Sequence, residues 1–163
     1  MTQLELRAPA HLVSSRARWY WTVRALTGWV ILLALEAPLA LAAHAAGTGW
    51  VLPVSATLVV AVAHLVVMPQ WRYRVHRWES TDTAVYTQSG WFTQERRIAP
   101  IARIQTVDTK RGPFEQLFGL ANITVTTASA AGPIKIHGLD RAVAAGLVND
   151  LTVRTQRAGG DGT

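Results

Sequence analysis

Hydrophobic residues are concentrated in two long stretches in the first half of the chain. Residues 25–46 read ALTGWVILLALEAPLALAAHAA, and residues 50–68 read WVLPVSATLVVAVAHLVVM. Each stretch is long enough to cross the ~30 Å hydrocarbon core of a bilayer as a helix. Between them, Gly47 and Gly49 permit the sharp reversal that a short connection needs. The pattern predicts a transmembrane helical hairpin over residues 23–70.

A pair of soluble core helices or a signal peptide would fit these stretches less well. Core helices of a soluble protein seldom follow each other at this length, and aromatic residues flank both stretches as they do at membrane interfaces. A cleavable signal peptide has a shorter apolar run of roughly 7–15 residues and begins closer to the start of a chain. A second apolar stretch follows the first almost at once, which favours the hairpin.

From residue 71 onward, short runs of β-branched and aromatic residues alternate with turn residues. These runs predict strands at 73–78, 84–88, 91–98, 104–108, 122–127 and 134–137. Over residues 139–153 the apolar positions recur at helical spacing, with Asp140 as the expected N-cap or first-turn acid. Strands closed by one amphipathic helix describe a small β-barrel or a pair of orthogonal sheets over residues 71–157. The Gly-rich residues 158–163 are expected to form a flexible tail.

Arginines indicate how the hairpin is oriented. They flank it on both sides, at Arg7, Arg16, Arg18 and Arg24 before it and at Arg72, Arg74 and Arg77 after it. The connection between the two stretches has no Lys or Arg. The positive-inside rule therefore places both termini in the cytosol and the turn on the outer side. Residues 1–22 are expected to be a cytosolic segment, and the protein is expected in the bacterial cytoplasmic membrane.

Polar residues inside the predicted spans are the first candidates for function. Glu36 lies near the middle of the first span, where a carboxylate is costly and usually faces protein or water. In an antiparallel hairpin, His64 comes within about one helical turn of the level of Glu36. The pair could line a proton or substrate path, with Ser55 and Thr57 as further polar neighbours. Alternatively, Glu36 is a structural residue that is satisfied by a neighbouring helix, often in a partner subunit.

Catalytic and metal-binding patterns are absent from the sequence. The chain has no cysteine, which excludes disulfides, thiolate catalysis and cysteine-bound metals. The five histidines lack the spacing of a zinc site, and no serine stands in a nucleophile-elbow motif. The sequence predicts a protein that is not an enzyme, with no catalytic residues, metal or cofactor.

The net charge of +6 draws attention to basic residues outside the spans. No aromatic-studded basic motif of a nucleic-acid-binding type occurs, so the expected anionic surface is the lipid bilayer rather than nucleic acid. The candidates for contacts with lipid headgroups or with a protein partner are Arg72, Arg74, Arg77, Arg96, Arg97, Arg103, Lys110 and Arg111. The first three can also serve only to anchor the topology, and the others can be solvated or lie at a protein interface.

A family resemblance rests on motifs of the second half. They are Arg74-Val75, Ser89-Gly90-Trp91, Ile98-Ala99-Pro100, Arg103-Ile104-Gln105-Thr106-Val107, Arg111-Gly112-Pro113-Phe114-Glu115, Phe118-Gly119-Leu120 and Thr124-Val125-Thr126-Thr127-Ala128. In this order they resemble the bacterial pleckstrin-homology (PH)-like domains of YdbS-type membrane proteins. The chain departs from the family pattern at His137, which precedes Gly138 and Leu139 where the family usually has Pro.

The resemblance implies an α+β membrane protein: two spans followed by a PH-like antiparallel β-sandwich or barrel capped by a C-terminal helix. It further implies an accessory subunit that assembles or regulates a membrane complex beside a larger membrane protein with related PH-like domains, or that self-associates. Some relatives are linked to envelope defence against membrane-active agents. Two alternatives remain, namely a transport or lipid-handling component that uses Glu36 and His64, and a module that binds anionic lipid.

Overall fold

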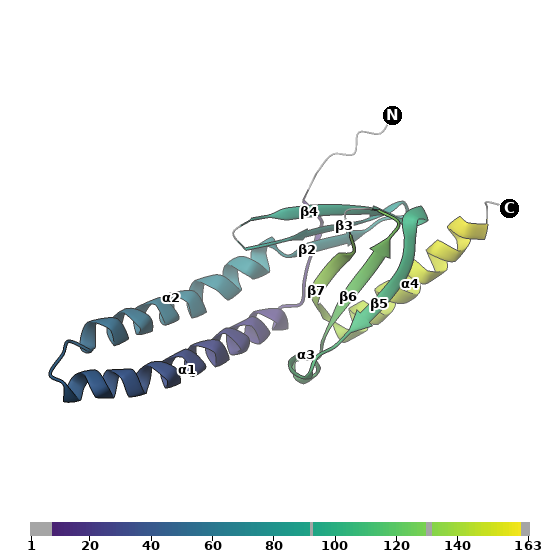
Figure 1. The fold of residues 1–163 in the computed structure, drawn as a ribbon. Coiled ribbons are helices and arrows are strands. Elements are labelled where there is room, and N and C mark those ends of the chain that lie inside the picture. Colours follow the sequence, from purple (N-terminus) through teal and green to yellow (C-terminus); the bar gives the residue numbers. More distant parts are fainter. Residues whose placement is uncertain (1–7, 92, 130–131, 161–163) are drawn as a thin grey trace.

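Two long helices project from a β-rich domain (Figure 1). The computed structural model describes residues 8–91, 93–129 and 132–160. Helix α1 (Arg16–Ala45) and helix α2 (Val51–Val75) run antiparallel, and both are long and apolar enough to cross a membrane. Their turn depends on Gly47, whose φ of 69° lies in the left-handed region that suits glycine. The N–H and the hydroxyl of Thr48 both donate to the Ala43 carbonyl, which satisfies an acceptor at the end of α1.

Helix α2 continues seven residues beyond the predicted end of the second span. It passes Pro69 and ends at Val75, where the N–H of His76 donates to the Arg72 carbonyl. The predicted strand at 73–78 is therefore wrong in its first half. Extending an existing helix adds a hydrogen bond for each residue, and this gain outweighs the β preference of Tyr73 and Val75.

Two antiparallel sheets form the domain. The first has the strand order β1 (His11–Leu12), β2 (Arg77–Ser80), β3 (Ala84–Ser89) and β4 (Glu95–Pro100). A 3-10 turn (Ile101–Arg103) leads to the second sheet, whose order is β5 (Ile104–Lys110), β6 (Leu120–Thr127) and β7 (Ile134–Asp140). The short helix α3 (Pro113–Leu117) connects β5 to β6, and helix α4 (Arg141–Gly160) packs against the second sheet.

The core lies between the sheets and α4. Alternation along β6 directs Ile123 and Val125 inward, where both are fully buried. They belong to one cluster with Leu147 and Leu151 of α4. This arrangement confirms the predicted α+β architecture, in which a PH-like sandwich is capped by the C-terminal helix.

The segment before the first span is part of the domain. Strand β1 pairs with β2, matching His11 with Trp78 and Leu12 with Arg77. The first turns of α1 then bury Ala17, Tyr20 and Trp21 in the domain core. Residues 8–21 are thus a structural element of the domain, whereas residues 1–7 lie outside the described residues.

The C-terminal helix begins later and ends later than its pattern suggested. Leu139 and Asp140 close strand β7, and α4 starts at Arg141. Leu139 is buried opposite Ala121 of β6, so its apolar character serves the sheet rather than the helix. Helix α4 extends to Gly160, into the expected flexible tail, of which residues 161–163 lie outside the described residues.

Candidate functional site

A groove of about 510 Å³ runs along the half of the hairpin next to its turn. Its lining is formed by Leu33, Glu36, Ala37, Ala40, Leu41, His44, Trp50 and Val54. The half-buried carboxylate of Glu36 accepts a hydrogen bond of 3.3 Å from the Thr57 hydroxyl of α2. At the end of the groove beside the hairpin turn, Trp50 Nε1 donates to His44 Nδ1 at 3.0 Å. The groove thus combines apolar walls with one carboxylate.

The predicted partners Glu36 and His64 are not brought together. His64 Nδ1 instead accepts a hydrogen bond of 3.0 Å from Trp29 Nε1. The helices pair so that Glu36 lies beside Thr57, and His64 is farther from the level of Glu36 than the one helical turn that the sequence predicted. His64 lies seven positions after Thr57 in the sequence, which is about 10 Å along the helix axis. The two side chains consequently have separate partners.

Three tryptophans gather near His64, in the half of the hairpin next to the domain. The Trp29 ring and the Trp91 ring both meet His64 edge to face, at centroid distances of 5.8 and 6.0 Å. Trp71 Nε1 donates to the Trp91 carbonyl at 3.1 Å. The turn between β3 and β4, which carries Trp91, therefore lies alongside α2.

Arginines and aromatic rings join the two helices to each other where they meet the domain. The Arg72 guanidinium lies 4.6 Å from the Trp21 ring centroid, and the Arg18 guanidinium lies 4.8 Å from that of Tyr73. Trp21 also packs on the ring of His76, which is only 4% exposed. Burial, followed by the nearby charge of Arg72, lowers the pKa of His76 from 6.5 to about 4, so the imidazole is neutral at pH 7.

A hydrogen-bond network continues this junction into the second sheet. The Tyr20 hydroxyl donates to Glu115 Oε1 at 2.8 Å, and Asn122 Nδ2 donates to the same oxygen at 3.1 Å. Asn122 Oδ1 in turn accepts from the Gly138 N–H at 3.0 Å. Partial burial alone would raise the pKa of Glu115, but hydrogen bonds from Tyr20, from the backbone of Glu115 and Gly112, and from Asn122 together outweigh it and lower that pKa. Helix α1, α3, β6 and β7 are therefore joined through one carboxylate.

A polar cleft of about 350 Å³ opens between the β3–β4 hairpin and β7. It is lined by Thr87, Ser89, Glu95, Arg97, Pro133, Lys135 and His137. Arg97 Nε donates to Glu95 Oε1 at 2.6 Å, and its Nη1 donates to the Pro133 carbonyl at 3.2 Å. Burial, together with the charges of Arg72 and Lys135, lowers the pKa of His137. The cleft thus brings two basic side chains, Arg97 and Lys135, together with the carboxylate of Glu95.

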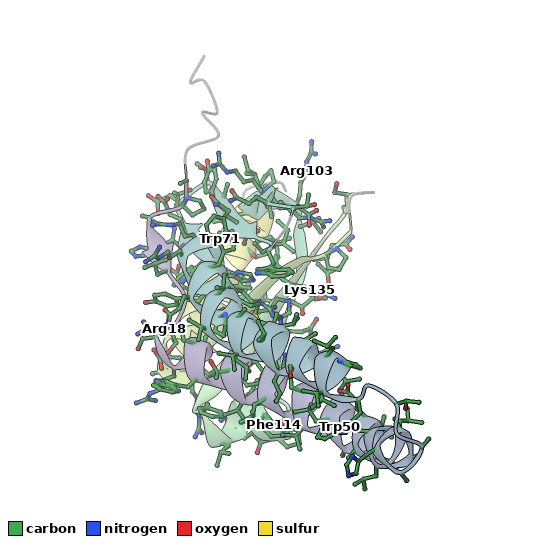
Figure 2. The ribbon with its side chains drawn as sticks, turned by 90° about the vertical axis from the view of Figure 1, so that its left-hand side faces the viewer. Arg18, Trp50, Trp71, Arg103, Phe114 and Lys135 are labelled. Atoms are coloured by element: carbon green, nitrogen blue, oxygen red, sulfur yellow. The ribbon has the colours of Figure 1, made fainter. Side chains whose placement is uncertain are left out.

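The predicted basic residues do not gather on one surface. Arg72 and Arg74 lie in the last turn of α2, Arg77 on β2, Arg96 and Arg97 on β4, Arg103 in the 3-10 turn, Lys110 at the end of β5 and Arg111 after it. Arg103 and Lys110 are at opposite ends of β5, roughly 20 Å apart at the rise of a strand. Arg111 donates to the Leu120 carbonyl, which is a structural contact. Figure 2 shows Arg103 well apart from Lys135 of the cleft.

Sequence reasoning found Arg97 but missed Lys135 and His137, which come from another sheet. The long-range packing of β7 against β3 and β4 brings Lys135 and His137 close to Arg97, and no local sequence pattern predicts this packing. Within the residues that the structure describes, no three His, Asp or Glu side chains gather closely enough to hold a metal ion.

The fold and the apolar helices define a membrane protein with a PH-like domain. The model of the bacterial PH domain family matches residues 22–154, so the chain belongs to that family. It is similar to the transmembrane protein YdbS of Bacillus subtilis (strain 168), with 31% identity over 85 residues that cover 52% of this chain and 54% of the relative. The chain thus spans about half the length of that relative. No solved structure matches.

These findings confirm the resemblance to YdbS-type proteins and the membrane character inferred from the hydrophobic pattern. Neither the description of the family nor the name of the relative denotes an enzyme.

Proposed function

We propose that the protein is a non-enzymatic, two-pass subunit of the cytoplasmic membrane that assembles or regulates a membrane complex. Both termini and the PH-like domain face the cytosol in this proposal. The arginines on both sides of the hairpin, and their absence from its turn, support the orientation. The partner is a larger membrane protein with related PH-like domains or a second copy of this chain.

The groove around Glu36 is the observation that carries the proposal. Thr57 is the hydrogen-bond partner of Glu36 among the described residues, and its 3.3 Å bond leaves most of the carboxyl's capacity unused. A carboxyl group in a bilayer normally faces protein or water. Beside it, Ala37 and Ala40 have side chains short enough for another helix to approach closely. A helix of a partner seated in this groove would satisfy Glu36 and cover its apolar walls.

The junction with the domain supports a regulatory or scaffolding part in such a complex. Trp21 and His76 fix the inner ends of both helices in the domain core. A partner that shifts the hairpin would therefore shift the domain as well. Defence of the envelope against membrane-active agents is the process we propose for the complex, on the basis of the family resemblance alone.

Filling the groove tests the proposal. Ala40→Leu should remove the partner that co-purifies with the tagged full chain in mild detergent, as measured by native mass spectrometry. Leu39→Phe is the matched control, because Leu39 is 73% exposed and does not line the groove. A wild-type chain that is only monomeric, with no partner, would contradict the proposal.

Glu36→Gln separates assembly from a transport or lipid-handling role. The amide keeps hydrogen-bonding capacity, so the complex should survive and resistance to membrane-active peptides should be unchanged. Loss of the phenotype with an intact complex would instead favour a proton-linked or transport role for Glu36.

A further inference from the structure

The exposed apolar side chains of the domain include two groups at separate tips. One is Trp91, in the turn between β3 and β4. The other is the outer face of α3, where Leu117 is 78% exposed and Phe114 about half exposed. Phe114 and Leu117 are three residues apart, so they share one face of this helical turn. Water is a poor solvent for side chains of this size, and such tips often mark an interaction site.

The first tip reaches the level of the membrane. Trp91 contacts His64, which belongs to the second predicted span. Its backbone carbonyl is bound by Trp71, and Trp29 lies on the other side of His64. Tryptophan is enriched where hydrocarbon meets the lipid headgroups, so this cluster indicates the depth of the inner interface. Figure 1 shows the β3–β4 hairpin pointing back along α2 toward the hairpin turn.

The second tip is fastened to the other helix, near its start. The hydrogen bond from Tyr20 to Glu115 and the edge contact of Tyr20 with Phe118 fasten α3 to the start of α1. Tyr20 precedes the first predicted span by five residues, about 7 Å along the helix. Figure 1 shows the β3–β4 hairpin above α2 and α3 below α1, on opposite sides of the helix pair.

Basic side chains surround this level and complement anionic headgroups. Arg24 follows Tyr20 by one turn, and its Nη1 lies 3.5 Å from the Tyr20 hydroxyl. Arg72 and Arg74 occupy the last turn of α2. Positive side chains next to exposed apolar ones are the pattern of a surface that lies against an anionic leaflet.

We propose that the PH-like domain rests on the bilayer itself, with Trp91 and the Phe114–Leu117 face inserted into the inner interface on opposite sides of the hairpin. The occupant of this surface is lipid. The inference rests on the proposed two-pass topology, because that topology sets the plane of the membrane. The proposal adds two membrane contacts of the domain, at Trp91 and at the Phe114–Leu117 face, to the two spans of that topology.

Single cysteines test the depth of each tip, since the natural chain has none. The variants Leu117→Cys and Thr93→Cys carry an environment-sensitive fluorophore at the two tips, in full-length protein reconstituted into vesicles with phosphatidylglycerol. Val62→Cys, on the exposed face of α2, is the control inside the span, and Val153→Cys is the control in water, because it lies in the C-terminal half of α4, which leads away from the hairpin (Figure 1). Quenching is measured with lipids that carry a nitroxide close to the headgroup.

The tip labels should lose roughly twofold or more of their fluorescence, as expected for side chains at the interface, while the label at residue 153 changes little. Quenching at residue 62 with none at residues 117 and 93 would overturn the docking proposal and leave the topology intact. If the label at residue 62 is also unquenched, both the topology and the docking proposal fail. Leu117 and Thr93 are exposed, so neither substitution disturbs the core.

Discussion

Helix α1 has two parts whose apolar side chains meet opposite surroundings. In its first turns Trp21 is 2% exposed and packs in the domain core, whereas Leu39 near its other end is 73% exposed. In the domain, apolar side chains pack against one another and are buried away from water. In the hairpin, side chains of the same kind face outward, which is stable only when lipid surrounds them. One continuous helix thus serves two solvents.

The contrast shows that the boundary between membrane and domain is not a boundary between structural units. The domain takes its core residues Ala17 and Trp21 from the same helix that continues into the hairpin. Domain and hairpin should therefore respond together to changes at the junction and independently to changes farther along α1.

The largest loss of stability is expected when the Trp21 side chain, which joins α1 to the domain core, is removed. Trp21→Ala should destabilise the protein by about 3–5 kcal/mol, since it leaves a cavity in the core. Trp19→Ala is the control, because Trp19 is two-thirds exposed, and it should cost less than about 0.5 kcal/mol. Denaturant unfolding in detergent, followed by near-UV circular dichroism, gives both values. Equal losses for the two variants would show that the first turns of α1 are not part of the core.

A substitution at Gly138 of β7, which faces Ala17 and Trp21 of α1, should lower the stability somewhat less. Gly138 has a φ of 76°, and a Cβ placed there would lie 2.9 Å from the Cβ of Ala17. Gly138→Ala should cost about 3 kcal/mol from strain and overpacking together. Gly132→Ala has a similar φ of 78° and open space around it, so it should cost only about 1–2 kcal/mol. Thermal unfolding of the two variants separates the close contact from the backbone strain.

Acid should weaken the junction before it affects the hairpin. His76 has a pKa of about 4 in the folded protein against 6.5 when unfolded, so the unfolded chain binds the proton more readily. Its contribution is complete above pH 6.5 and is lost as the pH falls toward 4, by about 2 kcal/mol at pH 5. His76→Gln should flatten this part of the stability curve, measured from pH 7 to 5. An unchanged slope in the variant would assign the acid sensitivity to another group.

The smallest expected effect concerns the network that fastens α3 to α1. Tyr20→Phe removes the hydrogen bond to Glu115 and should cost about 1 kcal/mol. Tyr73→Phe is the matched control, because the Tyr73 hydroxyl has no hydrogen-bond partner among the described residues. Hydrogen exchange of the α3 amides should accelerate in the first variant only. Exchange that is the same in both variants would argue against the fastening of α3 by Tyr20.

Much of the fold follows from local patterns. The length and apolar character of the two stretches predict both long helices, and the alternation of Ile123 and Val125 predicts β6. The helical spacing of Leu147 and Leu151 predicts α4. Each of these signals comes from neighbouring residues that share one face, so no long-range information is needed.

The remaining features depend on contacts between distant residues. Strand β1 has only His11 and Leu12 and becomes a strand because β2 pairs with it. Trp21 has the sequence context of an interfacial aromatic residue but lies in a core. The expected approach of Glu36 to His64 failed because the helices pair with Glu36 beside Thr57 and His64 beside Trp29, and composition does not encode this pairing.

The pairing of β1 with β2 also sets an order of events during biosynthesis. His11 leaves the ribosome long before its partner Trp78, and the whole hairpin is made between them. At roughly 5–20 residues per second, this gap lasts about 3–13 s. During that time the segment around His11 has no strand to pair with and must stay on the side of the membrane where β2 will emerge. Completion of the first sheet is therefore a late step. It follows synthesis of the hairpin and brings the segments before and after the hairpin together.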